Sequence, residues 1–139
     1  MAHGTTQRWF NTDAGFEKSS SKQLGNNYRL MPSRFNDVRS EGMSYGMMIT
    51  VQLDKKAEFD ALWNWSRTYM YHEDPKHPAY GFFSWSMNTD GKPRSESPAP
   101  DGEEYYVMAL YFASARWGTA KGFMIIGAWP TGCFPTKRP

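Results

Sequence analysis

The apolar residues of this chain concentrate in one stretch that begins directly after three charged side chains. Asp37, Arg39 and Glu41 lead into a run of mostly apolar residues that continues to about residue 53. The run is apolar on nearly every side at helical spacing, so we predict a buried helix over about 40–53 with Glu41 in its first turn. A lone carboxyl at such a place is more often solvated than functional, and Glu41 alone leaves both interpretations open.

A second helix is predicted over about 55–71, where the apolar side chains fall on one face and Asp54 is a suitable N-cap. Because so few residues separate the first two helices, we expect them to form an antiparallel hairpin. A third helix is predicted from about 101 to 117, since Asp101 begins an Asp-x-x-Glu capping pattern and Gly118 is a natural stop.

The region between the second and third helices is broken by prolines and glycines. Residues 80–87 alternate like a short strand, 88–91 have the composition of a turn, and 92–100 read as a polar loop. With so little strand, the order of helix, helix, loop and helix predicts an all-α fold built from helical hairpins.

Composition narrows the classes of function. A net charge of +2 gives no strong field for nucleic acid or membrane, and no apolar stretch has the length of a membrane span. The N-terminus shows no signal-peptide h-region, so we expect a cytoplasmic protein. The single cysteine, Cys133, excludes an internal disulfide. The aromatic content of 17% indicates either a large aromatic core or a site for carbohydrate or nucleobases.

Few side chains combine into a catalytic or metal-binding pattern. His72 and His77 enclose Pro75 and have no evident third ligand, so we expect a surface loop and no metal site. The sequence has no phosphate-binding glycine loop and no nucleophile elbow, and we expect no cofactor. What remains is a set of carboxylates near aromatic side chains, a combination typical of glycoside hydrolysis. These residues are Glu41, Trp85, Asp101, Glu103 and Glu104.

Four segments, in order and nearly without gaps, resemble glycoside hydrolase family eight, and most of all its xylan-acting branch. They are Asp-Val-Arg-Ser-Glu-Gly-Met-Ser-Tyr-Gly-Met-Met (37–48), Gly-Phe-Phe-Ser-Trp (81–85), Pro-Ala-Pro-Asp-Gly-Glu-Glu-Tyr-Tyr (98–106) and Ala-Ser-Ala-Arg-Trp-Gly (113–118). The resemblance divides the chain into a weakly patterned N-terminal segment (1–36), a partial catalytic domain (37–118) and an atypical tail (119–139).

The resemblance implies a fragment of an (α/α)6 barrel, in an inverting glycosidase that acts on β-1,4-xylo-oligosaccharides or xylan and releases xylose from the reducing end. It implies that Glu41 is the general acid, which must stay protonated near neutral pH. It places Asp101 against the sugar at the cleavage subsite, Trp85 as a stacking platform, and Arg39 and Tyr45 in the same substrate site, with Arg39 as a rim partner of Glu41. We therefore expect the Glu41 carboxyl to point into a groove near Asp101 and Trp85.

The resemblance also implies that the catalytic base, an Asp in this family, lies beyond residue 139, because the chains of the family are much longer. We therefore expect this chain to be a truncated form. Two alternatives remain open: an endo-acting β-1,4-xylanase or endoglucanase of the same family, and a non-catalytic carbohydrate-binding remnant. A lone fragment would also expose the apolar residues of the first predicted helix, which predicts low stability and self-association; these are Met47, Met48, Ile49 and Val51.

The tail loses every feature of the family after Gly118. When the sequence is back-translated and read from the third base of the Gly118 codon, degenerate codons allow a family-like continuation, Trp-Gly-Asn-Gly followed by an amphipathic helix. Two of its residues are forced, an Asp by the codons of Met124–Ile125 and an Ala by those of Trp129–Pro130. Our hypothesis is that 119–139 is a frame-shifted reading, and the alternative is a native C-terminus whose residues 123–126 pack against the helices.

Overall fold

The computed structural model describes residues 22–25 and 27–118. The tail 119–139, with its frame-shift hypothesis, lies outside the described residues, as does most of the N-terminal segment. Within the described part, three α-helices carry the core: α3 (Ser40–Gln52), α4 (Lys56–Trp65) and α5 (Pro100–Trp117). No helix in this part of the chain is both long enough and apolar enough to cross a membrane.

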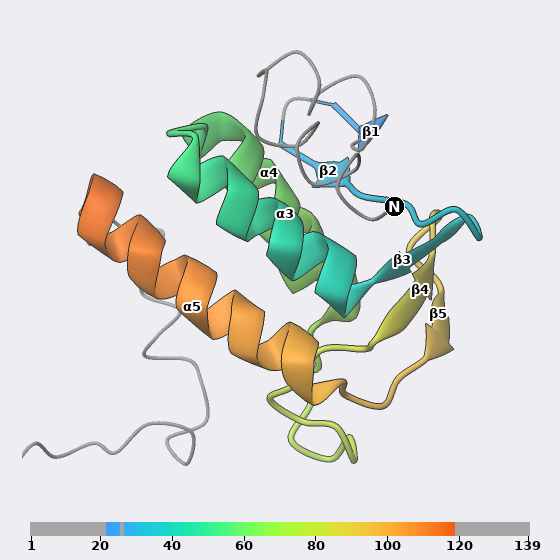
Figure 1. Cartoon of the computed structure of the whole chain (residues 1–139). Helices are drawn as coiled ribbons and strands as arrows, with labels where there is room; N and C mark the ends of the chain where they lie inside the picture. The colour runs from blue at the N-terminus through green and yellow to red at the C-terminus, as the bar shows by residue number, and fades with distance from the viewer. Residues whose placement is uncertain (1–21, 26, 119–139) are drawn as a thin grey trace, which may run out of the picture.

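Helix α3 lies between α4 and α5 and packs against both (Figure 1). The antiparallel hairpin predicted for the first two helices is confirmed, because α4 returns alongside α3 after a short connection. Helix α5 runs parallel to α3. Its N-terminal Gly102 lies against Ser40, and its C-terminal Trp117 donates a hydrogen bond to Asp54, just past the end of α3.

The predicted helix bounds agree with the structure except in the second helix. There α4 ends at Trp65 and continues as a π-helical turn, η1 (Ser66–Met70), in which the Tyr71 amide donates to the Ser66 carbonyl at 3.2 Å. The third helix ends as predicted, because Gly118 adopts a φ of 79° that favours glycine and stops the helix.

Both predicted capping residues are wrong. Lys55 is the N-cap of α4, whereas Asp54 has a φ of 57° and accepts a hydrogen bond of 2.7 Å from the Trp117 indole. Ala99 is the N-cap of α5, and Asp101 makes no side-chain capping bond because Pro100 already occupies the first turn. In both places the acidic side chain is left for tertiary contacts or solvent.

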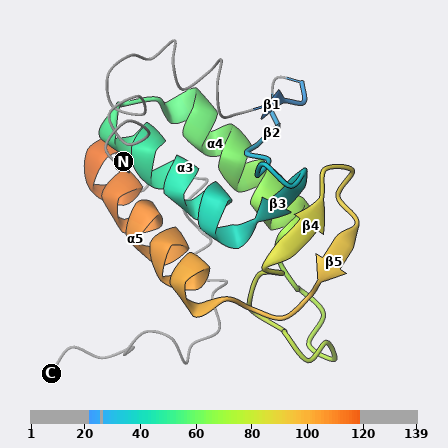
Figure 2. The same cartoon turned by 45° about the vertical axis from the view of Figure 1, so that its right-hand side comes forward.

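The expectation of an all-α fold is also wrong, since two small antiparallel sheets accompany the helices. One pairs β1 (Lys22–Gln23) with β2 (Arg29–Leu30). The other has the order β3-β4-β5 and lies beside the N-terminal ends of α3 and α5 (Figure 2); its strands are β3 (Asp37–Arg39), β4 (Ser86–Asn88) and β5 (Pro93–Ser95). The predicted turn at 88–91 is confirmed as the link between β4 and β5, with the Gly91 amide donating to Asn88 at 3.0 Å.

The core gathers large apolar side chains from all three helices, and its largest fully buried members are Trp65, Tyr106, Phe83, Leu30, Met43, Met47, Leu62, Met70, Met87, Val38 and Val51. The prediction that α3 leaves Met47 and Val51 exposed is therefore wrong. The exposed apolar surface belongs instead to the outer face of α5, where Tyr105, Met108, Tyr111 and Phe112 are each at least 37% exposed. Self-association through such a surface remains a prediction.

Candidate active site

Strand β3 runs directly into α3, and this junction fixes the place of Glu41. Arg39 is both the last residue of β3, paired with Ser86, and the extended N-cap of α3. The first helical amide, that of Ser40, donates to the Trp85 carbonyl at 3.0 Å. Since that carbonyl satisfies an amide that the helix cannot satisfy itself, Trp85 is held beside the first turn of α3, where Glu41 lies.

Helix α5 meets this first turn at Gly102. A Cβ atom at Gly102 would lie 2.4 Å from Ser40 Oγ and 3.2 Å from the amide nitrogen of Glu41, so only glycine permits the observed approach. The N-terminal turns of α3 and α5 are therefore in contact. Asp101 and Glu103 flank the contact, the first exposed and the second partly buried.

Tyr45 reports the proximity of the acidic groups. Its ring meets the Tyr105 ring edge to face at a centroid distance of 4.5 Å. The pKa of Tyr45 is raised by burial first, and then by Asp101, Tyr105 and the charge of Glu41. Because both carboxylates act on this one phenol, the structure brings together Glu41, Asp101 and Tyr45, and their roles in a substrate site stay a prediction.

Arg39 and Trp85 form the opposite border of this region. The Arg39 guanidinium lies 5.5 Å from the centre of the Trp85 ring, and its Nε is 3.0 Å from Asp37 Oδ2. Burial opposes the ionisation of Asp37, but hydrogen bonds from Ser33, Arg39 and Ser86 outweigh it and lower the pKa of Asp37. The expected pairing of Arg39 with Glu41 is therefore replaced by a pairing with Asp37.

Three polar atoms at the helix junction are buried without a hydrogen-bond partner among the described residues: Ser40 Oγ, Glu41 Oε2 and Glu103 Oε2. Glu103 Oε1 accepts a bond of 2.8 Å from the Phe83 amide. Burial raises the pKa of Glu103 to about 7, although this bond opposes the rise. From the sequence Glu103 was one of the candidate carboxylates but had no assigned role, and its spacing to the buried Tyr106 and Leu110 puts it on the inner face of the helix.

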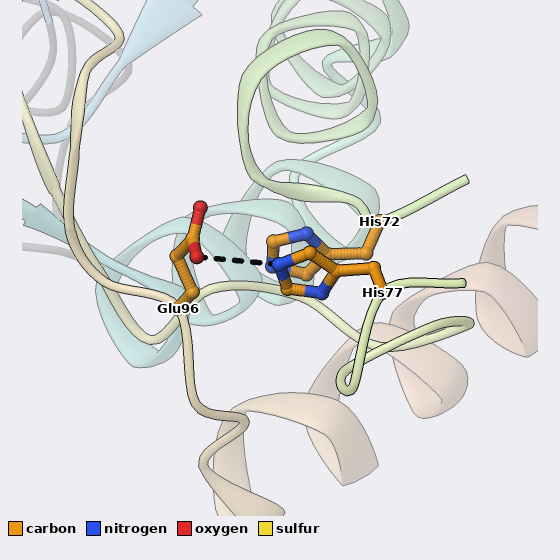
Figure 3. A group of neighbouring side chains, drawn as sticks. All are labelled: His72, His77 and Glu96. Atoms are coloured by element: carbon orange, nitrogen blue, oxygen red, sulfur yellow. Dashed lines mark hydrogen bonds and ion pairs between the residues drawn. The ribbon is translucent and has the colours of Figure 1, made fainter. Parts of the chain in front are cut away.

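Away from this junction, Figure 3 shows two imidazole rings lying face to face with a carboxylate beside them. The rings of His72 and His77 are stacked, with their centroids 3.9 Å apart and an angle of 4° between their planes. His77 Nε2 is 3.2 Å from Glu96 Oε2. The pKa of His72 is lowered by burial first and by His77 second. No third ligand for the two histidines is evident from the sequence, whereas the structure places Glu96 next to them.

Comparison with known proteins gives consistent results. The family described as "Glycosyl hydrolases family 8" matches residues 10–128, a longer range than the segments on which the resemblance was read. The chain is 59% identical over 83 residues to the "Reducing-end xylose-releasing exo-oligoxylanase Rex8A" of Paenibacillus barcinonensis, which covers 60% of this chain and 21% of that protein. It is 50% identical over 100 residues to the "Reducing end xylose-releasing exo-oligoxylanase" of Bifidobacterium adolescentis, covering 72% of this chain and 26% of that protein.

A solved structure shows the same likeness. The fold superposes with a TM-score of 0.67 on a catalytic mutant of a xylanase from Teredinibacter turnerae in complex with xylohexaose, at 60% identity. The match covers 75% of this chain and 27% of the xylanase. Endoglucanases are also similar, at 25–31% identity. This chain thus spans about a quarter of the length of the exo-oligoxylanases it matches.

Proposed function

Because the chain belongs to family 8 of the glycosyl hydrolases, we propose that it is part of an inverting glycosidase that releases xylose from the reducing end of β-1,4-xylo-oligosaccharides. Identities of 50–59% to exo-oligoxylanases, against 25–31% to endoglucanases, favour this activity over an endo-acting one. On this proposal the described helices are one part of an (α/α)6 barrel.

The observation that carries the proposal is the contact of Gly102 with Ser40 and Glu41, which joins the first turns of α3 and α5. Glu41 is then the general acid. Its carboxyl lies at this junction with Oε2 lacking a hydrogen-bond partner among the described residues, and on this proposal it gives its proton to the glycosidic oxygen. Asp101 is exposed beside it and suits the binding of sugar hydroxyls. Trp85 and Tyr45 supply aromatic surface for the pyranose rings.

Glu103 meets one condition for a general acid, because its pKa of about 7 keeps much of it protonated near neutral pH. Its position argues for a different role. Its Oε1 accepts a hydrogen bond of 2.8 Å from the Phe83 amide, which ties the carboxyl to the segment of Phe83. We therefore assign proton transfer to Glu41 and assign to Glu103 the attachment of α5 to the segment that carries Trp85.

The proposal is tested by a chimera in which the aligned segment of the Paenibacillus enzyme is replaced by residues 37–118 of this chain. We expect xylose release from xylotriose by the chimera, and a loss of about 10²–10⁴-fold when Glu41→Gln is added. Glu58→Gln is the matched control, because Glu58 is the first-turn carboxylate of α4 as Glu41 is of α3. An active chimera that is indifferent to Glu41→Gln would refute the assignment of the acid.

The 139-residue chain by itself is expected to bind xylotriose without measurable hydrolysis. An inverting mechanism needs a base about 6.5–9.5 Å from the acid to activate water, and on our proposal that base is supplied outside this chain. Tryptophan fluorescence measures binding, with weaker binding by Asp101→Asn, and chromatography measures released xylose. Steady release of xylose by the pure chain would contradict the prediction and would require Glu103 or Glu104 to act as base.

A further inference from the structure

Three metal-ligating side chains, His72, His77 and Glu96, converge near the segment that carries Trp85 (Figure 3). His72 and His77 belong to the loop that follows η1, and Glu96 comes directly after β5. The backbone holds the loop in place: the His72 amide donates to Phe82 at 3.0 Å and its carbonyl accepts from Gly81 at 2.9 Å. The backbone that carries His72 is therefore held in place before any ligand arrives.

The donor set fits a transition-metal ion of borderline softness. Two imidazole nitrogens and one carboxylate oxygen lie within 4.8 Å of one another, and one pair, His77 Nε2 and Glu96 Oε2, is at 3.2 Å. Zinc binds such atoms at about 2.0–2.2 Å in a tetrahedron, which places ligand atoms roughly 3.4 Å apart. The ligand atoms thus need to close by up to about 1.4 Å, and one imidazole must turn out of the stack, because the in-plane lone pairs of two parallel rings cannot both point at one ion. Glu96 is exposed and can move toward them. Mg²⁺ and Ca²⁺ prefer sites made only of oxygen ligands.

We propose that His72, His77 and Glu96 form a binding site for a divalent transition-metal ion of the Zn²⁺ class, which fastens the 72–77 loop to the segment after β5. A water molecule would complete a tetrahedral set, since three protein ligands leave one position open.

The present hydrogen bonds set the strength of this site. His72 Nε2 is 2.9 Å from Ser84 Oγ, and His77 Nδ1 accepts a hydrogen bond of 3.1 Å from the Ala79 amide. His77 therefore carries its proton on Nε2, facing Glu96. A metal at Nε2 displaces that proton to Nδ1, where it faces the Ala79 N–H, so binding requires the ring to give up this contact. We accordingly expect a micromolar rather than a nanomolar dissociation constant.

The experiment titrates ZnCl₂ into the metal-free chain by calorimetry. The background variant carries His3→Ala and Cys133→Ser, because the third histidine and the single cysteine are the other soft donors of the sequence. We expect one Zn²⁺ per chain with a dissociation constant of about 1–50 μM. We also expect His77→Ala and Glu96→Gln each to weaken binding by tenfold or more.

Asp74→Asn is the matched control. Asp74 is an exposed carboxylate of the same loop that accepts the Lys76 amide, and asparagine keeps that acceptor. Its affinity for Zn²⁺ should stay within twofold, and the visible spectrum of the Co²⁺-loaded chain should show a tetrahedral ion that is lost in Glu96→Gln. Absence of binding at 100 μM Zn²⁺ in the background variant overturns the proposal. Equal affinities of the Glu96→Gln and Asp74→Asn variants also overturn it.

Discussion

Replacing Gly102 with alanine is expected to lower the free energy of unfolding by about 1–3 kcal/mol, as overpacking of a tight contact does. The new Cβ would lie 2.9 Å from Ser40 Cβ and 3.2 Å from the Glu41 amide nitrogen. The Ser40 hydroxyl can rotate away, but these two atoms belong to the helix itself. The two first turns must therefore separate. Urea unfolding followed by circular dichroism measures the loss.

Gly42→Ala is the control for this prediction, because Gly42 is the third residue of α3 as Gly102 is of α5. The gain in helix propensity is the same at both positions, yet the nearest atom to a Cβ at Gly42 is Met31 O at 3.7 Å, an ordinary contact. Gly42→Ala should be neutral or stabilising. Adding Ser40→Gly to Gly102→Ala should restore part of the loss, and a strictly additive double variant would show that the contact is not the cause.

The second large effect concerns the dependence of stability on pH. Glu103 has a pKa of about 7 in the folded chain, against 4.5 as its ordinary value. Below pH 4.5 the side chain is protonated in both states. As the pH rises from 4.5 to 7, the unfolded chain loses this proton while the folded chain keeps it, so the folded state loses stability. At 1.36 kcal/mol per pKa unit the loss is about 3 kcal/mol, complete somewhat above pH 7.

Glu103→Gln should remove this part of the slope, because glutamine does not titrate and its carbonyl can still accept the Phe83 amide. Unfolding in urea at several pH values between 5 and 8 gives the change of unfolding free energy with pH for each protein. The difference between the two slopes is the contribution of Glu103. His72 has a lowered pKa and acts in the opposite sense, since its part of the stability is lost as the pH falls; this term is common to both proteins. Parallel curves for the two proteins would show that Glu103 is ionised when folded.

The helices could be predicted from sequence because their apolar spacing is a local property, and the bounds of α3 and α5 came within one residue. The choice of Glu41, Asp101 and Tyr45 as candidate site residues came from the family resemblance, and their roles stay a prediction. The caps could not be predicted in the same way. Asp54 is a good capping residue by type, but the Trp117 indole, 63 positions away, binds it instead.

The small strands were not predicted because each is only two or three residues long, which is too short for an alternation of apolar and polar residues to be seen. Pro93 opens β5 and reads as a breaker, although an edge strand accepts proline. The pairing of Glu96 with His77 could not be predicted for another reason. The two residues are 19 positions apart, and the fold of the sheet and the loop brings them into contact. Such meetings depend on tertiary structure, which spacing along the chain does not encode.

The direct passage from β3 into α3 has a consequence for how this part of the protein can vary in length. An α-helix turns by about 100° per residue. One residue inserted or deleted between Arg39 and Glu41 would rotate the Glu41 side chain by that angle while β3 stayed paired with β4. The link between β4 and β5 is a turn that carries none of the candidate site residues, and an added residue there lengthens a loop without rotating a helix. Relatives should therefore differ in length at that turn and keep the junction at residue 40 ungapped.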